Sequence, residues 1–249
     1  MSAVDEFAAL HKAGDPLVLF NVWDVGSAKA VAEAGARAIA TGSASLAGAQ
    51  GFADGEGIPF SALLATVRAI SQAIDLPLSV DFETGFAPHA EEVAANAAAL
   101  AEAEAIGCNL EDRLLDQDTL REPAEQADRI AAAAGAGLFV NARTDVFLRP
   151  LMKGGNPNEP RLVDAAIQRA YIYAAAGARS FFAPGLSDPD CVAQLCEAVA
   201  LPVNIMRLPD MVSNAQLAAL GVRRISYGPA PWSEAMERVR EAAALASSV

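Results

Sequence analysis

Hydrophobic residues along the chain gather in short runs, and longer mixed stretches of alanine and polar residues separate these runs. The runs are rich in Val, Ile, Leu and Phe, as buried parallel strands are, and they lie at 17–24, 37–43, 76–83, 107–112, 138–145, 180–185, 201–206 and 223–228. The stretches between them have helical periodicity, at about 27–34, 60–74, 90–106, 124–134, 162–176, 188–199, 214–220 and 231–246. Eight strands alternating with eight helices predict a (β/α)₈ TIM-type barrel that forms a single domain over residues 1–249.

A doubly wound open sheet is the alternative architecture for such an alternation. That fold carries a Gly-x-Gly-x-x-Gly turn between a strand and a helix, and the sequence shows no such turn. In a barrel, catalytic side chains lie where the strands end. Polar residues of this chain are concentrated at those ends, so the barrel also predicts the place of the active site.

The composition of the chain argues against nucleic acids and membranes as binding partners. With 53% hydrophobic residues, 6% aromatic residues and a net charge of −13, the chain is poorly suited to bind nucleic acid or an anionic membrane surface. No apolar run reaches the roughly 18 residues of a membrane span, and the N-terminus lacks the pattern of a secretory signal. Three cysteines are too few for a disulfide framework. We therefore expect a cytoplasmic protein that acts on a small molecule.

Two acidic clusters stand at the ends of neighbouring predicted strands. Asp81 and Glu83 are two residues apart at the end of the third strand, and Glu111 and Asp112 end the fourth. Parallel strands joined by a helix place their carboxyl ends side by side, so these carboxylates should converge and repel one another unless a divalent cation offsets their charge. We predict a Mg²⁺ site, which could also take Mn²⁺. Capping of helix N-termini is the alternative role for such acids.

Further polar residues follow the second and fifth strands. Arg143, in NARTD, is suited to bind a substrate carboxylate through two hydrogen bonds, although it could also pair with Asp145 or with an acid of the metal site. The small residues Thr41, Gly42 and Ser43 would let backbone N–H groups approach an anion. An ordinary Gly/Ser loop up to residue 56 is the alternative for this segment.

Several spaced motifs together resemble the isocitrate lyase/phosphoenolpyruvate mutase superfamily, over about residues 20–227. They read TGSASLAGAQGFADGE, VDFETGF, NLED, ARTD and AIQRAYIYAAAGARSFFAPG. Members of this superfamily are (β/α)₈ barrels that use Mg²⁺ to hold a 2-oxo acid. They stabilise its enolate while a C–C or C–P bond is made or broken. The resemblance also implies a homo-oligomer, either a tetramer or a dimer.

The resemblance implies roles for nine residues. Asp81, Glu83 and Glu111 resemble the metal acids, some of which act through bound water. Arg143 resembles the Arg that binds the substrate carboxylate, and Asp54 resembles an aspartate near the reacting centre. The remaining residues resemble groups that bind the substrate, and they are Thr41, Gly42, Ser43 and Asn204.

Departures from the family pattern narrow the expected reaction. The lyases carry a Lys-x-Cys-Gly-His type motif after the fourth strand, whose Cys supplies a proton, but residues 113–126 contain no Cys, His or Lys. The lyases also have a Tyr where this chain has Ile39. We therefore do not expect a standard isocitrate or methylisocitrate lyase. The lack of a basic loop also weakens the case for a phosphonopyruvate enzyme, because the net charge is −13.

These observations favour a Mg²⁺-dependent lyase that cleaves a C–C bond in a small 2-oxo acid, as in the decarboxylation of an oxaloacetate-like substrate. Loss of CO₂ needs no general acid, and a metal-bound 2-oxo acid oriented by Arg143 needs little else. Two alternatives remain open. One is a phosphonopyruvate-type mutase or hydrolase, with Asp54 or a bound water as nucleophile or base. The other is a protein that binds a 2-oxo acid without turning it over.

Overall fold

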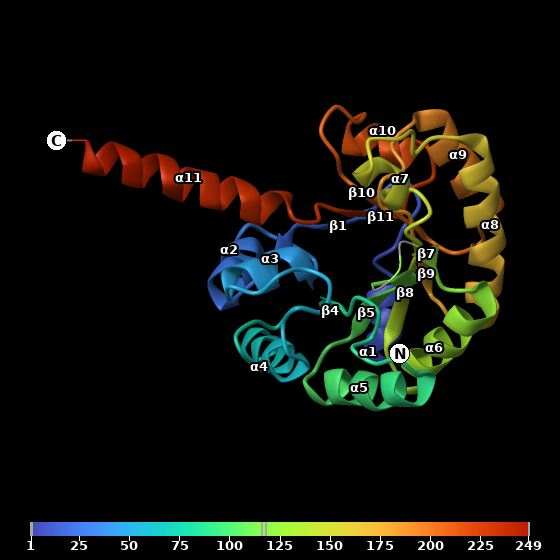
Figure 1. Cartoon of the computed structure of the whole chain (residues 1–249), viewed down its shortest axis with the longest axis horizontal. Helices are drawn as coiled ribbons and strands as arrows, with labels where there is room; N and C mark the ends of the chain where they lie inside the picture. The colour runs from blue at the N-terminus through green and yellow to red at the C-terminus, as the bar shows by residue number, and fades with distance from the viewer. Residues whose placement is uncertain (1, 116, 118, 249) are drawn as a thin grey trace.

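All eight predicted strands form, and they enclose a nearly closed barrel in the computed structural model, which describes residues 2–115, 117 and 119–248 (Figure 1). The sheet is parallel, with the order β1-β11-β10-β9-β8-β5-β4-β3-β2. Its strands are β1 Leu17–Leu19, β2 Asn21–Val22, β3 Ile39–Thr41, β4 Leu78–Asp81, β5 Gly107–Glu111, β8 Phe139–Arg143, β9 Ser180–Phe182, β10 Val203–Met206 and β11 Arg224–Ser226. The predicted (β/α)₈ fold is confirmed.

The barrel closes through the first predicted strand. Residues 17–24 form two short pieces, β1 and β2, on either side of Phe20. β1 pairs with β11 and β2 pairs with β3, so one extended segment joins the last strand to the second. Asn21 strengthens this closure near the strand ends, because its side chain donates to the Thr41 carbonyl and accepts from the N–H groups of Tyr227 and Gly228.

The helices on the outside of the barrel follow the predicted stretches closely. They are α2 Val25–Glu33, α4 Phe60–Ser71, α5 Ala90–Glu102, α6 Pro123–Gly135, α8 Pro160–Ala175, α9 Pro189–Ala198, α10 Asn214–Ala219 and α11 Ala230–Ser247. Local signals set several of their starts. Asp24 begins α2 with a capping box to Ser27, and Asp188 caps α9 ahead of a proline. Asp24 thus ends the first strand as a helix cap.

Three short helices and a hairpin were not predicted. They are α1 Ala3–Ala8, α3 Ser43–Ala49, α7 Leu148–Met152, and the pair β6 Arg113–Leu114 with β7 Thr119–Leu120. The expected loop after Thr41 is therefore helical from Ser43 on, since SASLAGA contains three alanines and one leucine, which favour a helix. The segment 113–126 includes two positions, 116 and 118, that lie outside the described residues.

The core lies between the sheet and the surrounding helices. Helix α5 directs Val93, Ala97 and Leu100 inward at intervals of four and three residues, and all three are fully buried. Burial of each large aliphatic side chain contributes about 1.5–3 kcal/mol. Small buried alanines, Ala97 of α5 and Ala133 of α6, let these neighbouring helices pack closely together.

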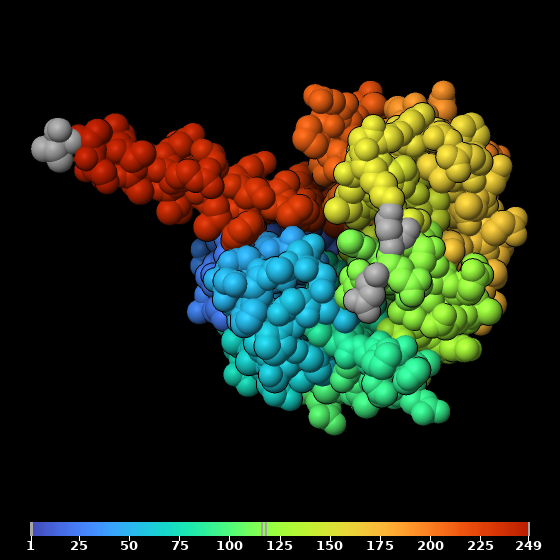
Figure 2. Space-filling view, viewed as in Figure 1, coloured from blue at the N-terminus to red at the C-terminus, as the bar shows by residue number. Residues whose placement is uncertain are grey.

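Helix α11 differs from the other outer helices because it points away from the barrel (Figure 1; the red rod in Figure 2). Among its described residues only Pro231 is buried, and Val239 is 60% exposed. Trp232 fixes its start by lying close against Gly48 of α3, where a side chain on Gly48 would clash with the indole. None of the helices formed by the described residues has both the length and the apolar character that a bilayer crossing requires.

Candidate active site

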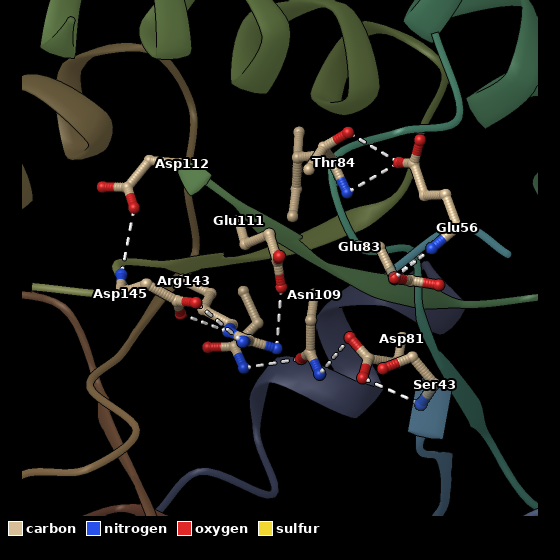
Figure 3. A network of polar contacts seen from close by, with 12 residues as sticks. Ser43, Glu56, Asp81, Glu83, Thr84, Asn109, Glu111, Asp112, Arg143 and Asp145 are labelled. Atoms are coloured by element: carbon tan, nitrogen blue, oxygen red, sulfur yellow. Dashed lines mark hydrogen bonds and ion pairs between the residues drawn. The ribbon is translucent and has the colours of Figure 1, made fainter. Parts of the chain in front are cut away.

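The end of β4 carries Asp81, whose carboxylate is held by neighbouring strands. The Asp81 N–H donates to the Thr41 hydroxyl at 2.9 Å. One carboxylate oxygen accepts from the Ser43 N–H at 3.0 Å, and the other lies 3.4 Å from the Asn109 amide nitrogen (Figure 3). Among the described residues no cation forms an ion pair with Asp81. Hydrogen bonds, and not a direct ion pair, therefore orient its carboxylate.

Glu83 follows two residues later in a left-handed backbone conformation, with φ of 48°. One of its carboxylate oxygens accepts from the Glu56 N–H at 2.7 Å. The pKa of Glu83 is raised to about 8, mainly by burial and in addition by the nearby negative charges of Asp81 and Asp54. Carboxylates therefore accumulate at the end of β4 without a direct ion pair among the described residues. Arg224 and Arg143 act on Asp81 only from a greater distance: burial tends to lower the pKa of each arginine, and the charge of Asp81 opposes this effect.

The end of β5 is balanced by Arg143. Its Nη1 lies 2.8 Å from Glu111, and its Nε and Nη2 donate to the two oxygens of Asp145 at 2.7 and 3.0 Å (Figure 3). Burial tends to lower the pKa of Arg143, but Asp145 and Glu111 outweigh it and raise that pKa. Burial raises the pKa of Glu111, against the opposing effect of Arg143.

Asp112 points away from the cavity, because successive side chains of a strand alternate in direction. Its carboxylate accepts from Tyr173 and Arg169 of α8 and from the Asp145 N–H, at 2.8 to 3.0 Å. Burial raises the pKa of Asp112, although Arg169 opposes this shift. Asp112 thus fixes the backbone at Asp145, and through Asp145 it fixes Arg143.

A cavity of about 210 Å³ opens at these strand ends. Its lining combines acidic and amide side chains with apolar residues from the later strands and α7. The lining residues are Asn21, Gly42, Ser43, Ala44, Asp54, Asp81, Asn109, Arg143, Leu148, Met152, Phe182, Pro184, Met206, Ser226, Gly228 and Pro229. A wider hollow of about 930 Å³ lies on the outside of the barrel. That hollow is lined largely by alanine and other apolar groups, so the smaller cavity is the better candidate for catalysis.

The cavity brings together five of the nine residues singled out from the sequence, namely Gly42, Ser43, Asp54, Asp81 and Arg143. The other four do not line it. Thr41 supports the backbone of Asp81, and Glu83 and Glu111 stand beside the cavity in contact with Glu56 and Arg143. Asn204 is fully buried and accepts from the Ser226 hydroxyl, two residues before the cavity-lining Met206 on the same face of β10.

Other residues of the site have no counterpart among those selected from the sequence. Asn21 and Asn109 line the cavity, and Asn141 donates to Asn109 from the next strand at 2.8 Å. Asparagine is uncommon in strands, and four of the predicted strands carry one inside an apolar run, at positions 21, 109, 141 and 204. This repeated pattern is a signal that could have identified them.

The donor set fits a hard divalent cation. Within the described part of the chain, no three His, Cys, Asp or Glu side chains are arranged to hold an ion directly. Mg²⁺ suits such a site, because it keeps several of its waters and needs only one or two carboxylates. The placement of Asp81 supports this fit, because its carboxylate lines the cavity and is held there by the Ser43 N–H. Burial first, and then the charges of Asp81 and Asp54, raise the pKa of the neighbouring Glu83, and a nearby cation would favour its charged form.

Comparison with known proteins places the chain in a family. The model of the phosphoenolpyruvate phosphomutase family matches residues 7–246. The chain belongs to this family, within the isocitrate lyase/phosphoenolpyruvate mutase superfamily. It is 46% identical to a Burkholderia cenocepacia J2315 protein provisionally described as a phosphonomutase, whose crystal structure matches with a TM-score of 0.91 over 97% of this chain and 98% of that one. An uncharacterized protein of Mycobacterium tuberculosis is 35% identical over 95% of this chain and 87% of its own length.

Relatives with named activities are more distant. The 2-methylisocitrate lyase of Escherichia coli is 30% identical over 79% of this chain, and the oxaloacetate decarboxylase of a Bradyrhizobium species is 31% identical over 74%. The chain spans 66% and 64% of these two enzymes. A phosphonopyruvate hydrolase in complex with oxalate and Mg²⁺ shares the fold at 24% identity and a TM-score of 0.83, over 97% of this chain and 85% of that one. The matched family and the two sequence relatives are mutases and C–C lyases, and the chain is an enzyme of this group.

Proposed function

We propose that this protein is a Mg²⁺-dependent lyase that cleaves a C–C bond in a small 2-oxo acid, such as an oxaloacetate-like substrate. The observation that carries the proposal is that Asp81 and the Arg143 guanidinium line the same 210 Å³ cavity. A 2-oxo acid presents a carboxylate and a keto oxygen that suit a cation and a guanidinium together. The oxaloacetate decarboxylase relative and the complex of the phosphonopyruvate hydrolase with oxalate and Mg²⁺ support this assignment.

Asp81 would bind the cation directly, and Glu83 and Glu111 would bind it through water. When bound, Mg²⁺ would supply the positive charge that stabilises an enolate oxygen. The Ser43 N–H donates to the Asp81 carboxylate, and the Thr41 hydroxyl accepts from the Asp81 N–H. These two contacts would orient Asp81 for the cation before the substrate binds.

Arg143 would bind the substrate carboxylate with donors that its own partners leave available. A guanidinium has five N–H groups, and three of them are used by Glu111 and Asp145. One N–H on Nη1 and one on Nη2 therefore have no partner among the described residues and are available to a ligand. Phe182, whose ring centre lies 6.0 Å from the guanidinium carbon, limits the side from which the ligand can approach.

The proposal is tested by measuring pyruvate formation from oxaloacetate in the presence of Mg²⁺ and after its removal by EDTA. We expect turnover with the metal and its loss without the metal, above the rate of spontaneous decarboxylation measured in the same buffer. An absence of metal-dependent turnover would exclude oxaloacetate as the substrate.

A phosphonopyruvate reaction is the second candidate, because the 46% identical Burkholderia protein is described as a phosphonomutase. A phosphonate brings additional negative charge, and among the described residues Arg143 is the one cation that lines the cavity. Assays of phosphonopyruvate and oxaloacetate under identical conditions separate the two reactions. Thermal stabilisation by both acids with Mg²⁺, without product from either, would instead indicate a binding protein.

We also propose that the protein functions as a homo-oligomer, in which α11 packs on a second copy. Trp232, Met236, Val239, Ala243 and Ala246 form an apolar stripe along this projecting helix at helical spacing. The 930 Å³ hollow lies between α2 and α10. At its base the side chains of Val18 and Phe20, from the first strand segment, are exposed. Both the stripe and the hollow are apolar. In the proposed oligomer, the stripe of α11 from one copy packs into the hollow of a second copy.

Oligomerisation is tested by light scattering of the wild type and of Val239→Asp. We expect the wild type to elute as a dimer or tetramer and the variant as a monomer. Ala244→Asp is the matched control, because Ala244 lies outside the stripe, about 140° around α11 from Val239, and this variant should keep the wild-type mass. A monomeric wild type would contradict this proposal.

A further inference from the structure

The loop between α3 and α4 carries Asp54 to the cavity, and Glu56 attaches this loop to the barrel. At its start the Phe52 N–H donates to the Ala47 carbonyl, and near its end Ile58 is buried in the core. Between these two anchors, every recorded hydrogen bond from residues 53–57 to the described part of the chain involves Glu56. The position of Asp54 over the cavity therefore depends on one side chain.

Glu56 places its carboxylate in an anion-binding turn formed by residues 83–86. The same oxygen accepts from the Thr84 N–H at 3.0 Å, the Thr84 hydroxyl at 2.6 Å and the Phe86 N–H at 2.9 Å (Figure 3 shows the two bonds to Thr84). Backbone N–H groups converge there because Glu83, Gly85 and Phe86 all have positive φ, of 48°, 98° and 53°. Such concave runs of N–H groups bind anions in many proteins, and in this chain the anion is Glu56 itself.

Backbone strain is concentrated at this contact. Among the described residues, five residues other than glycine have positive φ, and three of them are Glu56, Glu83 and Phe86. Left-handed conformations of such residues persist only where the surrounding structure enforces them, and they cluster at ligand clamps and active sites. The turn is also fixed from behind, because the buried Arg129 of α6 donates to the carbonyls of Thr84, Ala87 and Pro88. A rigid receptor thus faces a loop that has few other attachments.

We propose that Glu56 is a positioning residue that clamps the loop 51–58 over the cavity and so holds Asp54 in place. The clamp joins the loop directly to the metal-site strand, since the Glu56 N–H also donates to Glu83 at 2.7 Å. Without the Glu56 carboxylate the loop opens, Asp54 leaves the cavity wall, and a bound ligand dissociates faster. The catalytic consequence rests on the proposed function, whereas the clamp itself does not.

Hydrogen exchange of the backbone amides tests the clamp without any assay of turnover. We expect the hydrogen-bonded loop amides, those of Phe52 and of residue 56, to exchange about tenfold faster or more in Glu56→Ala than in the wild type. Glu56→Gln should give an intermediate rate, because a neutral amide oxygen accepts weaker hydrogen bonds. Glu104→Ala is the matched control, since Glu104 is an exposed glutamate with positive φ at the end of α5. Equal loop exchange in Glu56→Ala and Glu104→Ala would overturn the proposal.

Binding of oxalate in the presence of Mg²⁺ tests whether Glu56 acts through Asp54. We expect Glu56→Ala to raise the oxalate dissociation rate about tenfold, and Asp54→Asn to have a smaller effect in the Glu56→Ala background than in the wild type. Additive effects of the two substitutions would show that Glu56 does not act through Asp54, and would overturn the claim that the clamp positions Asp54. If the wild type binds no oxalate, the proposed function fails, and the exchange result still decides the clamp.

Discussion

The carboxylates at the end of β4 and those at the end of β5 lie in opposite electrostatic surroundings. Beside β5, Glu111 and Asp145 share Arg143, and Asp112 pairs with Arg169. At β4, the carboxylates are held by N–H and hydroxyl donors, and no ion pair is recorded for Asp81 or Glu83 among the described residues. The β5 cluster carries its own counter-charge in direct ion pairs, whereas the β4 cluster has none among the described residues and, in the proposed function, takes its counter-charge from Mg²⁺. The two should therefore respond in opposite ways to mutation and to metal.

Asp81→Asn should give the largest change, because it removes the proposed direct ligand of Mg²⁺ at β4. We expect kcat/KM to fall about a thousandfold and the stabilisation by Mg²⁺ in thermal melts to disappear. The metal-free variant should melt no lower than the wild type, since one of the repelling charges is gone. Asp75→Asn is the control, because Asp75 is exposed just before the other end of the same strand. A variant that kept its response to Mg²⁺ would show that Asp81 is not a ligand.

Arg143→Gln should have the next largest effect, and mainly on stability. The substitution leaves Glu111 and Asp145 buried without their shared cation, and breaking a buried ion pair costs about 3–5 kcal/mol. In a domain of this size we expect Tm to fall by about 10 °C, measured by circular dichroism without metal. Arg161→Gln removes an exposed arginine and should leave Tm nearly unchanged. If Arg143→Gln stabilised the metal-free protein, the two clusters would not differ as described.

The pH dependence of Mg²⁺ binding should reflect Glu83. Its pKa of about 8 lies above the ordinary value of 4.5, so the metal-free folded state keeps a proton that the unfolded chain has released. The stability due to Glu83 is therefore full below pH 4.5 and is lost as the pH rises through about 8. Mg²⁺ must displace this proton, so its affinity should rise with pH by up to about tenfold per unit until pH 8.

Calorimetric titration in buffers of different ionisation enthalpy measures the proton that Glu83 releases. In Glu83→Gln both the proton release and the rise in affinity with pH should be smaller, while Glu104→Gln should behave as the wild type does. A pH-independent affinity in the wild type would mean that Glu83 is already charged before the metal binds.

The sequence predicted the barrel and the convergence of Asp81, Glu83, Glu111 and Arg143, because strand periodicity and the parallel arrangement fix where strand ends meet. It also contained the reason that Asp112 faces α8, since adjacent strand residues point to opposite sides. The Glu56 contact could not be predicted, because it joins a loop to a turn 27 to 30 residues away and follows no periodicity. The direction of α11 likewise depends on the backbone between β11 and Trp232, since its amphipathic pattern would suit packing on its own barrel equally well.

Thr41→Val should give the smallest change and tests whether the hydrogen-bonded frame of the β4 cluster matters as much as its charges. The substitution keeps the shape of the side chain but removes the acceptor of the buried Asp81 N–H. An unpaired buried N–H costs about 1–3 kcal/mol, and part of that loss should appear as a weaker Mg²⁺ affinity, by about fivefold, as expected when an outer-shell partner of a metal ligand is lost. Thr66→Val is the control, since Thr66 lies on the outer helix α4. Equal Mg²⁺ affinity in Thr41→Val and the wild type would mean that the charge of Asp81, rather than its orientation, determines metal binding at β4.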